Sequence, residues 1–293
     1  MDFIKLLEEK KVVLFDGGMG TELAGRGSEM GGISNINAPE AVRAVHRDYI
    51  QAGADVLITN TFTMNRINAE SHGLKIDIKK INETGVRLAR EAAGRNNLVF
   101  GDLGPTGQML EPYGTYSEEQ FYDNYAEQAA VLAAGGADGL IIETFSDLRE
   151  AICALRACRD KTGLPVILSL AFSTTEKGGR TIMGSTVEEA AEAAEKYGAV
   201  AVGANCGDLD PSGMAVIAGM FRRVVDLPVM VQPNAGRPRL VKGKTVFDMQ
   251  PEDYAEALLQ CLEKGASILG GCCGTTPAHI KALSMKVKKF NRL

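Results

Sequence analysis

Two adjacent cysteines near the C-terminus, Cys272 and Cys273, are the residues whose types and spacing most clearly suggest chemistry. Both follow an apolar run and lie among glycines, and Cys206 ends a similar apolar run. Neighbouring strand residues normally point to opposite faces, so both thiols reach one ion only if the backbone is irregular there. Gly271 and Gly274 permit such a backbone. Three thiolates form a soft ligand set, which predicts a zinc site.

The number of cysteines favours a catalytic site over a structural one. Structural zinc sites are usually closed by four protein ligands, whereas catalytic sites have three and an open position. The alternative is a closed site completed by His46, His72 or His279, but all three fall in helical patterns. Zinc with three thiolates is a weak Lewis acid toward water, yet it lowers the pKa of a bound thiol. The pattern therefore predicts activation of a thiol substrate for alkyl transfer.

The remaining cysteines, Cys153, Cys158 and Cys261, lie inside helical patterns, where we expect them to be small buried hydrophobes. Thiols rather than disulfides are expected, because no secretory signal opens the chain. No apolar run reaches the roughly 20 residues of a membrane span. The net charge of -5, with scattered basic residues, argues against a nucleic-acid surface. These features predict a cytoplasmic protein.

The elements that must position the cysteines are short apolar runs alternating with helical patterns, after a leading helix over 3–10. Continuous apolarity is typical of parallel strands buried on both faces. The 293 residues hold eight such units without a polar linker, which predicts a single-domain α/β fold, a (β/α)8 TIM barrel over 1–293. A doubly wound open sheet is the alternative. The expected strands are 12–16, 56–60, 98–102, 139–143, 166–170, 199–205, 229–233 and 267–271.

The helix boundaries are also predicted from local signals. Four strands follow a glycine that can take the left-handed conformation at a helix C-terminus. Ser117 with Gln120 and Thr186 with Glu189 have the spacing of a capping box. Pro211, Pro251 and Pro277 stand at expected first helical positions.

Polar residues stand at the C-terminal end of one apolar run after another. In a (β/α)8 barrel the active site lies at the C-terminal ends of the strands, so these residues are expected to meet. The alternative is that strand ends are polar because loops are polar, but this explains three cysteines poorly. The strand-end residues are Asp16, Gly17, Gly18, Asn60, Thr61, Asp102, Glu143, Thr144, Cys206, Asn234, Cys272 and Cys273.

The sequence resembles the homocysteine S-methyltransferase family. Residues 270–280 (GGCCGTTPAHI) are similar to its zinc motif, in the version of the homocysteine domain of cobalamin-dependent methionine synthase. The resemblance spans nearly the whole chain. Its further motifs are 15–21 (FDGGMGT), 59–62 (TNTF), 101–107 (GDLGPTG), 142–147 (IETFSD), 205–206 (NC) and 233–236 (PNAG).

This resemblance implies a (β/α)8 barrel whose zinc is held by Cys206, Cys272 and Cys273. Homocysteine would supply the fourth ligand through its sulfur, and the resulting thiolate would attack an activated methyl group to give methionine.

The resemblance also implies how the substrate is held. Asp16 and Glu143 would bind the ammonium group, unless they are loop or helix caps, and the amides around Gly17 and Gly18 would receive the carboxylate. Asn234 resembles the residue that occupies the open zinc position when no thiol is bound.

Two departures from the family pattern affect the expected amino-acid pocket. Gln232 stands where the family usually has glutamate, and residues 207–210 (GDLD) replace the usual serine-containing segment. They leave open the methylation of another small thiol.

The methyl donor is expected to be methylcobalamin or another methylcorrinoid on a partner protein. The corrinoid-ligating Asp-x-His-x-x-Gly pattern is absent around the three histidines. S-methylmethionine or betaine is the alternative donor. A hypothesis from a different class is a zinc-binding or thiol-binding partner subunit without turnover.

Overall fold

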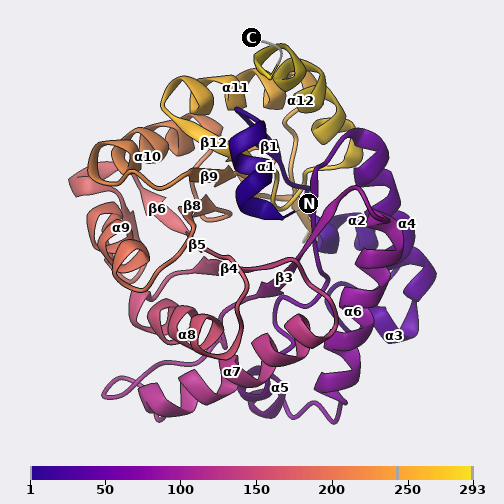
Figure 1. Cartoon of the computed structure of the whole chain (residues 1–293), viewed down its shortest axis with the longest axis vertical. Coiled ribbons are helices and arrows are strands. Elements are labelled where there is room, and N and C mark those ends of the chain that lie inside the picture. Colours follow the sequence, from indigo (N-terminus) through magenta and orange to yellow (C-terminus); the bar gives the residue numbers. More distant parts are fainter. Residues whose placement is uncertain (1, 242–243, 292–293) are drawn as a thin grey trace.

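Parallel strands surrounded by helices form a (β/α)8 barrel in the computed structural model, which describes residues 2–241 and 244–291 (Figure 1). The strand order is β1-β12-β9-β8-β5-β4-β3-β2, and β1 meets β2 through a parallel bridge between Phe15 and Val56. The predicted barrel and its eight strands are confirmed, and the open-sheet alternative is wrong. The barrel strands are β1 (Val13–Leu14), β2 (Val56–Ile58), β3 (Leu98–Leu103), β4 (Gly139–Phe145), β5 (Val166–Leu170), β8 (Ala201–Asn205), β9 (Val229–Gln232) and β12 (Ala266–Leu269).

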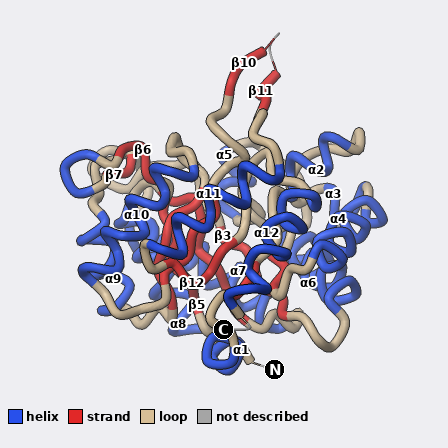
Figure 2. The backbone as a smooth tube through the Cα atoms, turned by 90° about the horizontal axis from the view of Figure 1, so that it is seen from above, coloured by secondary structure: helices blue, strands red, loops and turns tan. Residues whose placement is uncertain are grey.

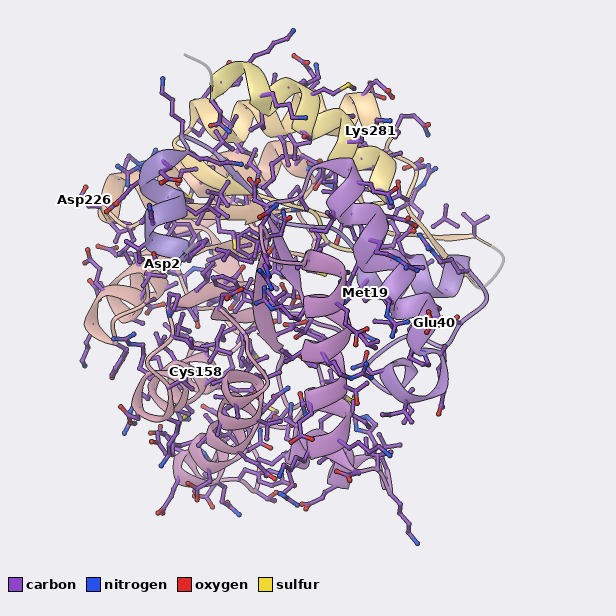
Figure 3. All side chains as sticks on the ribbon, turned by 45° about the vertical axis from the view of Figure 1, so that its right-hand side comes forward. Asp2, Met19, Glu40, Cys158, Asp226 and Lys281 are labelled. Atoms are coloured by element: carbon purple, nitrogen blue, oxygen red, sulfur yellow. The ribbon has the colours of Figure 1, made fainter. Side chains whose placement is uncertain are left out.

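Helices form an outer ring around the strands (Figure 1). Glu40 and Lys281 are exposed on this ring, whereas Cys158 is buried (Figure 3). No helix in the described part of the chain is both long and apolar enough for a membrane span. The helices are α1 (Phe3–Glu9), α2 (Met19–Gly25), α3 (Ser34–Asn37), α4 (Pro39–Ala52), α5 (Arg66–Ser71), α6 (Ile78–Ala93), α7 (Glu118–Ala134), α8 (Leu148–Lys161), α9 (Val187–Lys196), α10 (Pro211–Val224), α11 (Pro251–Glu263) and α12 (Pro277–Phe290).

The helix boundaries follow the predicted local signals. Both capping boxes form, at α7 and α9, and α10, α11 and α12 each begin with the predicted proline. The glycines before four of the strands take positive φ, from 75° at Gly198 to 105° at Gly53. The boundaries are therefore encoded locally, by caps and by glycines.

Alternation along the strands divides the core into two layers. Inward-facing residues such as Phe15, Phe100 and Ile141 fill the barrel interior, whereas outward-facing ones such as Ile142 pack against helices. Helix α1 covers one end of the interior, where the rings of Phe3 and Phe100 lie 4.8 Å apart. The opposite end, to which the strands point with their C-termini, carries the polar side chains.

Two hairpins lie outside the barrel, and the sequence did not predict them. They pair β6 (Phe172–Thr174) with β7 (Arg180–Thr181), and β10 (Arg239–Val241) with β11 (Lys244–Val246). The second projects from the molecule on the side opposite to α1 (Figure 2). Each of these strands has two or three residues, which is too short for a hydrophobic period to be recognised.

Candidate active site

Three thiols from two different βα units meet at the C-terminal end of the barrel. Cys206 follows β8, and Cys272 and Cys273 follow β12, yet their sulfur atoms all lie within 4.8 Å of one another. Zinc–sulfur bonds of about 2.3 Å in tetrahedral geometry place sulfur atoms about 3.8 Å apart. The three thiols can therefore close around one zinc ion with little movement.

The backbone at Cys206 is held in a conformation that few non-glycine residues adopt. Its φ is 53°, in the left-handed region, and its N–H donates to Gln232 O over 3.1 Å. The next residue, Gly207, also has positive φ, and a Cβ there would lie 2.5 Å from Phe172 O. Such strain is often retained at functional sites, where it fixes the direction of a side chain.

The double cysteine lies in a loop that is tied to two neighbouring segments. Cys272 N–H donates to Pro233 O, and Ala235 N–H donates to Cys273 O, both over 3.0 Å. Gly274, with φ 78°, leaves no room for a Cβ because Phe247 packs directly against it. These contacts supply the irregular backbone that the flanking glycines predicted.

The charge on the three thiols also fits a cation. Hydrogen bonds from Cys206 and then Cys272 stabilise the Cys273 thiolate and lower its pKa. The pKa of Cys272 is raised, first by its hydrogen bonds with Cys206 and Cys273. One negative charge is therefore tolerated readily, whereas three thiolates require a cation to replace the thiol protons.

A cavity of about 340 Å³ lies beside the thiols. Its wall combines the cysteines with acidic, hydroxyl and apolar side chains from several strand ends. It is lined by Gly17, Gly18, Met19, Gly20, Thr21, Met30, Gly31, Ile58, Thr59, Asn60, Phe62, Asp102, Glu143, Thr144, Cys206, Gly271, Cys272 and Cys273.

The predicted acidic residues lie in this region, and neither is a helix cap. Asp16 is 2% exposed; its Oδ2 accepts from Ile58 N–H over 3.0 Å, and its Oδ1 has no partner among the described residues. Burial is the main cause of its raised pKa. Burial also raises the pKa of Glu143, to about 8, with a smaller contribution from Cys206. Asp16 is buried and Glu143 is half-buried, and carboxyl groups so shielded from water beside a cavity are suited to binding a cationic group.

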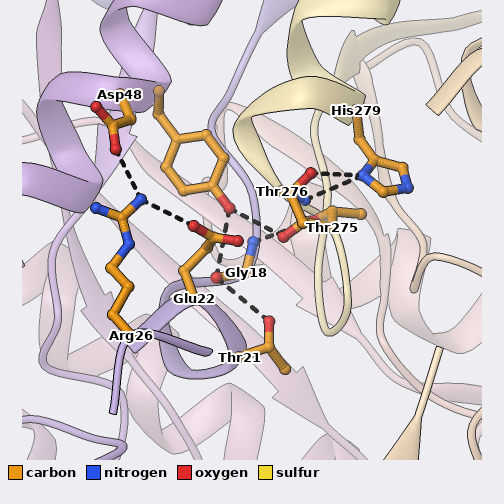
Figure 4. A network of polar contacts seen from close by, with 9 residues as sticks. Gly18, Thr21, Glu22, Arg26, Asp48, Thr275, Thr276 and His279 are labelled. Atoms are coloured by element: carbon orange, nitrogen blue, oxygen red, sulfur yellow. Dashed lines mark hydrogen bonds and ion pairs between the residues drawn. The ribbon is translucent and has the colours of Figure 1, made fainter. Parts of the chain in front are cut away.

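The Gly17–Gly18 turn is bound to the double-cysteine loop through Thr275 (Figure 4). Gly18 N–H donates to Thr275 Oγ1 over 2.9 Å, and Thr275 Oγ1 donates to Cys272 O over 2.6 Å. Tyr49 OH donates to Thr275 O over 3.0 Å. The amide of Gly18 is therefore already used within the protein.

A second link joins the same two loops. Gly274 N–H donates to Thr21 Oγ1 over 3.1 Å. Thr21 Oγ1 in turn lies 3.4 Å from Gly18 O (Figure 4). The turn after β1 and the loop after β12 therefore form one hydrogen-bonded unit.

Asn234 and Gln232 are both buried. Asn234 Nδ2 donates to Gly207 O over 3.2 Å. Asn234 Oδ1 and Gln232 Oε1 have no partner in the described part of the chain. Asn234 thus contacts the residue that follows Cys206, near the thiols.

The histidines do not join the cysteines. His279 Nδ1 lies 2.9 Å from Thr276 Oγ1, and its Nε2 lies 2.9 Å from Met249 O. His46 is buried in α4, and His72 is exposed at the end of α5. Within residues 2–241 and 244–291, the cysteine cluster has no histidine in reach.

The sequence did not assign a role to three residues of the site. Asp102 and Thr144 stood among the strand-end residues without a function, and Thr275 lay in the motif without one. Thr144 has φ 65° and lines the cavity, and its N–H donates to Asn205 Oδ1 over 2.9 Å. A β-branched residue gives no local signal for this conformation, which depends on Asn205 at the end of β8, two strands away in the barrel.

Comparison with known proteins agrees with this geometry. The family model described as homocysteine S-methyltransferase matches residues 13–287. The methionine synthases of Mycobacterium tuberculosis and Mycobacterium leprae are 33% and 32% identical to the chain over 99% of its length. The chain spans about a quarter of these relatives, 26% and 25%.

A solved structure supports the same relationship. The metallated form of the homocysteine methyltransferase MmuM from Escherichia coli superposes with a TM-score of 0.80 at 26% identity, covering 96% of this chain and 98% of that chain. The matched family region includes all three clustered cysteines. This chain belongs to the homocysteine S-methyltransferase family.

Proposed function

We propose that this chain is a zinc-dependent homocysteine S-methyltransferase that forms methionine. The observation that carries the proposal is the position of the three thiols, which converge at the wall of a cavity that also holds acidic side chains. The family membership supports the acceptor, and the thiol geometry supports the metal.

Cys206, Cys272 and Cys273 are the proposed zinc ligands. When bound, zinc lowers the pKa of a substrate thiol and keeps it as a nucleophilic thiolate at neutral pH. The protein contributes three thiolates and leaves the fourth position free for the substrate. Asn234, whose buried Oδ1 has no partner among the described residues, is the proposed occupant of that position in the absence of substrate.

The other residues position the amino-acid part of the substrate. Asp16 and Glu143 are proposed to bind its ammonium group, and the Gly17–Gly18 turn to receive its carboxylate. The Gly18 N–H already donates to Thr275, so the other backbone N–H groups of the turn must supply the hydrogen bonds to the carboxylate. Fixing both ends of the amino acid orients the sulfur toward the incoming methyl group, which accelerates the transfer by positioning.

The proposed donor is methylcobalamin or another methylcorrinoid carried by a partner protein. Methionine synthases are among the relatives that the chain matches, and it spans only about a quarter of their length. S-methylmethionine or betaine is the second candidate donor. We further propose that 1–293 is one homocysteine-binding domain and that it works in the cytoplasm.

A donor panel tests the proposal. Zinc-loaded protein is incubated with homocysteine and, separately, methylcobalamin, methyltetrahydrofolate, S-methylmethionine or betaine, and methionine is measured by mass spectrometry. Methionine formed with methylcobalamin is the expected result. Product with only one of the small onium donors would select the second candidate.

A matched control separates catalysis from binding alone. Cys206→Ser removes one proposed zinc ligand, whereas Cys261→Ala changes a buried cysteine in α11 that lies outside the cluster. Turnover is expected to be lost only in the first variant. Homocysteine binding without methionine from any donor would instead support a thiol-binding subunit.

A further inference from the structure

Asp102 occupies an inward-facing position near the end of β3. It lies two residues after Phe100, whose ring fills the barrel interior, and alternation therefore directs its carboxyl group to the same side. Glu143 stands two residues after Ile141 on the neighbouring strand β4. Both Asp102 and Glu143 line the cavity beside the thiols. Adjacent strands thus direct two acidic side chains into one space.

One oxygen of the Asp102 carboxyl group is buried without a hydrogen-bond partner in the described part of the chain. The residue is 4% exposed, and Oδ1 has no hydrogen-bond partner within the described ranges. Burying a carboxyl group without a partner is costly. Such a group in a cavity wall points to a ligand that supplies the missing donor.

Glu150 shows how this fold treats a buried carboxyl group away from the cavity. Its Oε1 accepts hydrogen bonds from Thr106 N–H, Thr106 Oγ1 and Tyr125 OH, over 2.8, 2.7 and 2.8 Å. Glu150 is thus satisfied within the protein. Asp102 is equally buried and lacks these contacts.

The backbone of Asp102 is held firmly by neighbouring side chains. Its N–H donates to Thr59 Oγ1 over 3.0 Å, and its carbonyl oxygen accepts from Thr61 Oγ1 over 2.9 Å. The two hydroxyl groups lie 2.7 Å apart. The Asp102 side chain therefore starts from a fixed position at the cavity wall, which reduces the entropy lost on binding.

The carboxyl groups that surround this part of the cavity favour a cationic ligand. Burial raises the pKa of Asp102 most, and the charges of Glu143 and Asp16 raise it further. A positive group bound among the three carboxyl groups removes this repulsion. The Asp16 Oδ1 atom also lacks a partner within residues 2–241 and 244–291. An ammonium group carries three hydrogens and can donate one to each carboxyl group.

We propose that Asp102 binds the α-ammonium group of the amino-acid thiol, together with Asp16 and Glu143. This inference rests on the proposed function, because homocysteine is the thiol that brings the ammonium group. It assigns Asp102 to substrate recognition.

The test compares two thiols that differ only in the ammonium group. Binding of homocysteine and of 4-sulfanylbutanoate to the zinc-loaded protein is measured by isothermal titration calorimetry, for the parent chain and for Asp102→Asn. Loss of a hydrogen bond to a charged group predicts roughly 10- to 100-fold weaker homocysteine binding. Binding of 4-sulfanylbutanoate is expected to stay unchanged, since this ligand has no ammonium group for Asp102 to bind.

Glu150→Gln is the matched control, because it changes a buried carboxyl group that makes its contacts within the protein. It is expected to preserve the affinity ratio of the two thiols. Asp102→Ser provides the same comparison if the asparagine variant does not fold.

Equal weakening of both thiols by the Asp102 variants, or no weakening of either, would overturn the inference. It would also be overturned if the parent chain bound both thiols equally. Failure of the parent chain to bind homocysteine at all would refute the proposed function instead. The ratio of the two affinities cancels the contribution of the sulfur–metal bond to binding, since both ligands have the same thiol group.

Discussion

The N–H group of Gly18 donates to Thr275 Oγ1 over 2.9 Å, across 257 positions of the sequence. Thr275 Oγ1 also donates to Cys272 O over 2.6 Å. One hydroxyl group therefore joins the turn proposed to receive the substrate carboxylate to the loop proposed to hold zinc. A shift in either loop is transmitted to the other.

Replacement of Thr275 by valine tests this link. The side chain keeps its size but loses both hydrogen bonds, and buried partners left unpaired cost about 1–3 kcal/mol each. We expect zinc affinity and homocysteine affinity to fall together by 10-fold or more, and Thr275→Ser to restore both. Chelator competition and calorimetry measure the two affinities.

Thr162→Val is the control for this experiment. Thr162 Oγ1 likewise donates to a carbonyl group and accepts from an N–H, at the end of α8. The control is expected to lower stability without weakening either ligand. Similar ligand losses in both variants would show that Thr275 acts only through general stability.

Removal of each clustered thiol is expected to abolish stoichiometric zinc binding. Changing a group that only hydrogen-bonds to a metal ligand costs about 10- to 100-fold in metal affinity, so Cys206→Ser, Cys272→Ser and Cys273→Ser should each cost more. Metal content after dialysis is measured by plasma mass spectrometry. Cys158→Ala, which changes a buried helical cysteine, should retain one zinc per chain. Retention of zinc by any of the three serine variants would contradict the ligand assignment.

A Cβ at Gly18 has no room. It would lie 2.6 Å from Cys272 O and 2.7 Å from Thr21 Oγ1, so the double-cysteine loop must move. Overpacking of this kind costs about 1–3 kcal/mol. We expect Gly18→Ala to lower both the unfolding free energy and the zinc affinity, as measured by denaturant titration and chelator competition.

Gly25→Ala is the matched control, because Gly25 is the last residue of helix α2, which begins directly after Gly18. Nothing lies within 4 Å of a Cβ at Gly25, and alanine favours the helix. Stability is therefore expected to be unchanged or higher. Equal unfolding free energies and zinc affinities of the two variants would mean that the double-cysteine loop accommodates a Cβ at Gly18 without cost.

We predict that the buried His46 lowers the unfolding free energy of the protein in weak acid. Burial lowers its pKa from 6.5 to about 3, and both ring nitrogens lack partners in the described part of the chain. Below pH 6.5 the unfolded chain therefore binds a proton that the folded chain does not bind, so the unfolding free energy falls as the pH falls. For this single group the loss between pH 7.5 and pH 5.5 is about 1.4 kcal/mol.

His46→Leu should remove this contribution. The difference in unfolding free energy between the variant and the parent chain, measured by urea titration, should shift in favour of the variant as the pH falls toward 5.5. The raised pKa of Glu143 acts in the opposite direction, because the folded state then binds the extra proton. Glu143 is present in both chains, so the difference isolates His46. A difference that does not depend on pH would contradict the prediction.

The sequence alone determined the barrel and most of its boundaries. Parallel strands buried on both faces require continuous apolar runs, and helix ends require caps that local residues supply. These signals act over a few residues, so Ser117 and Gln120 could be recognised without a structure. The (β/α)8 topology then assigned Cys206 and the double cysteine to the same end of the barrel, because active-site residues follow the strands.

Only the tertiary structure decided how these residues meet. The left-handed backbone at Cys206 depends on Gln232 in the next strand, and the occupied amide of Gly18 depends on Thr275. That Asp102 Oδ1 lacks a partner among the described residues was known only from the structure. An aspartate at a strand end looks the same in the sequence whether or not its carboxyl group is hydrogen-bonded. Contacts between residues far apart in the sequence are set by packing, and local sequence patterns do not predict them.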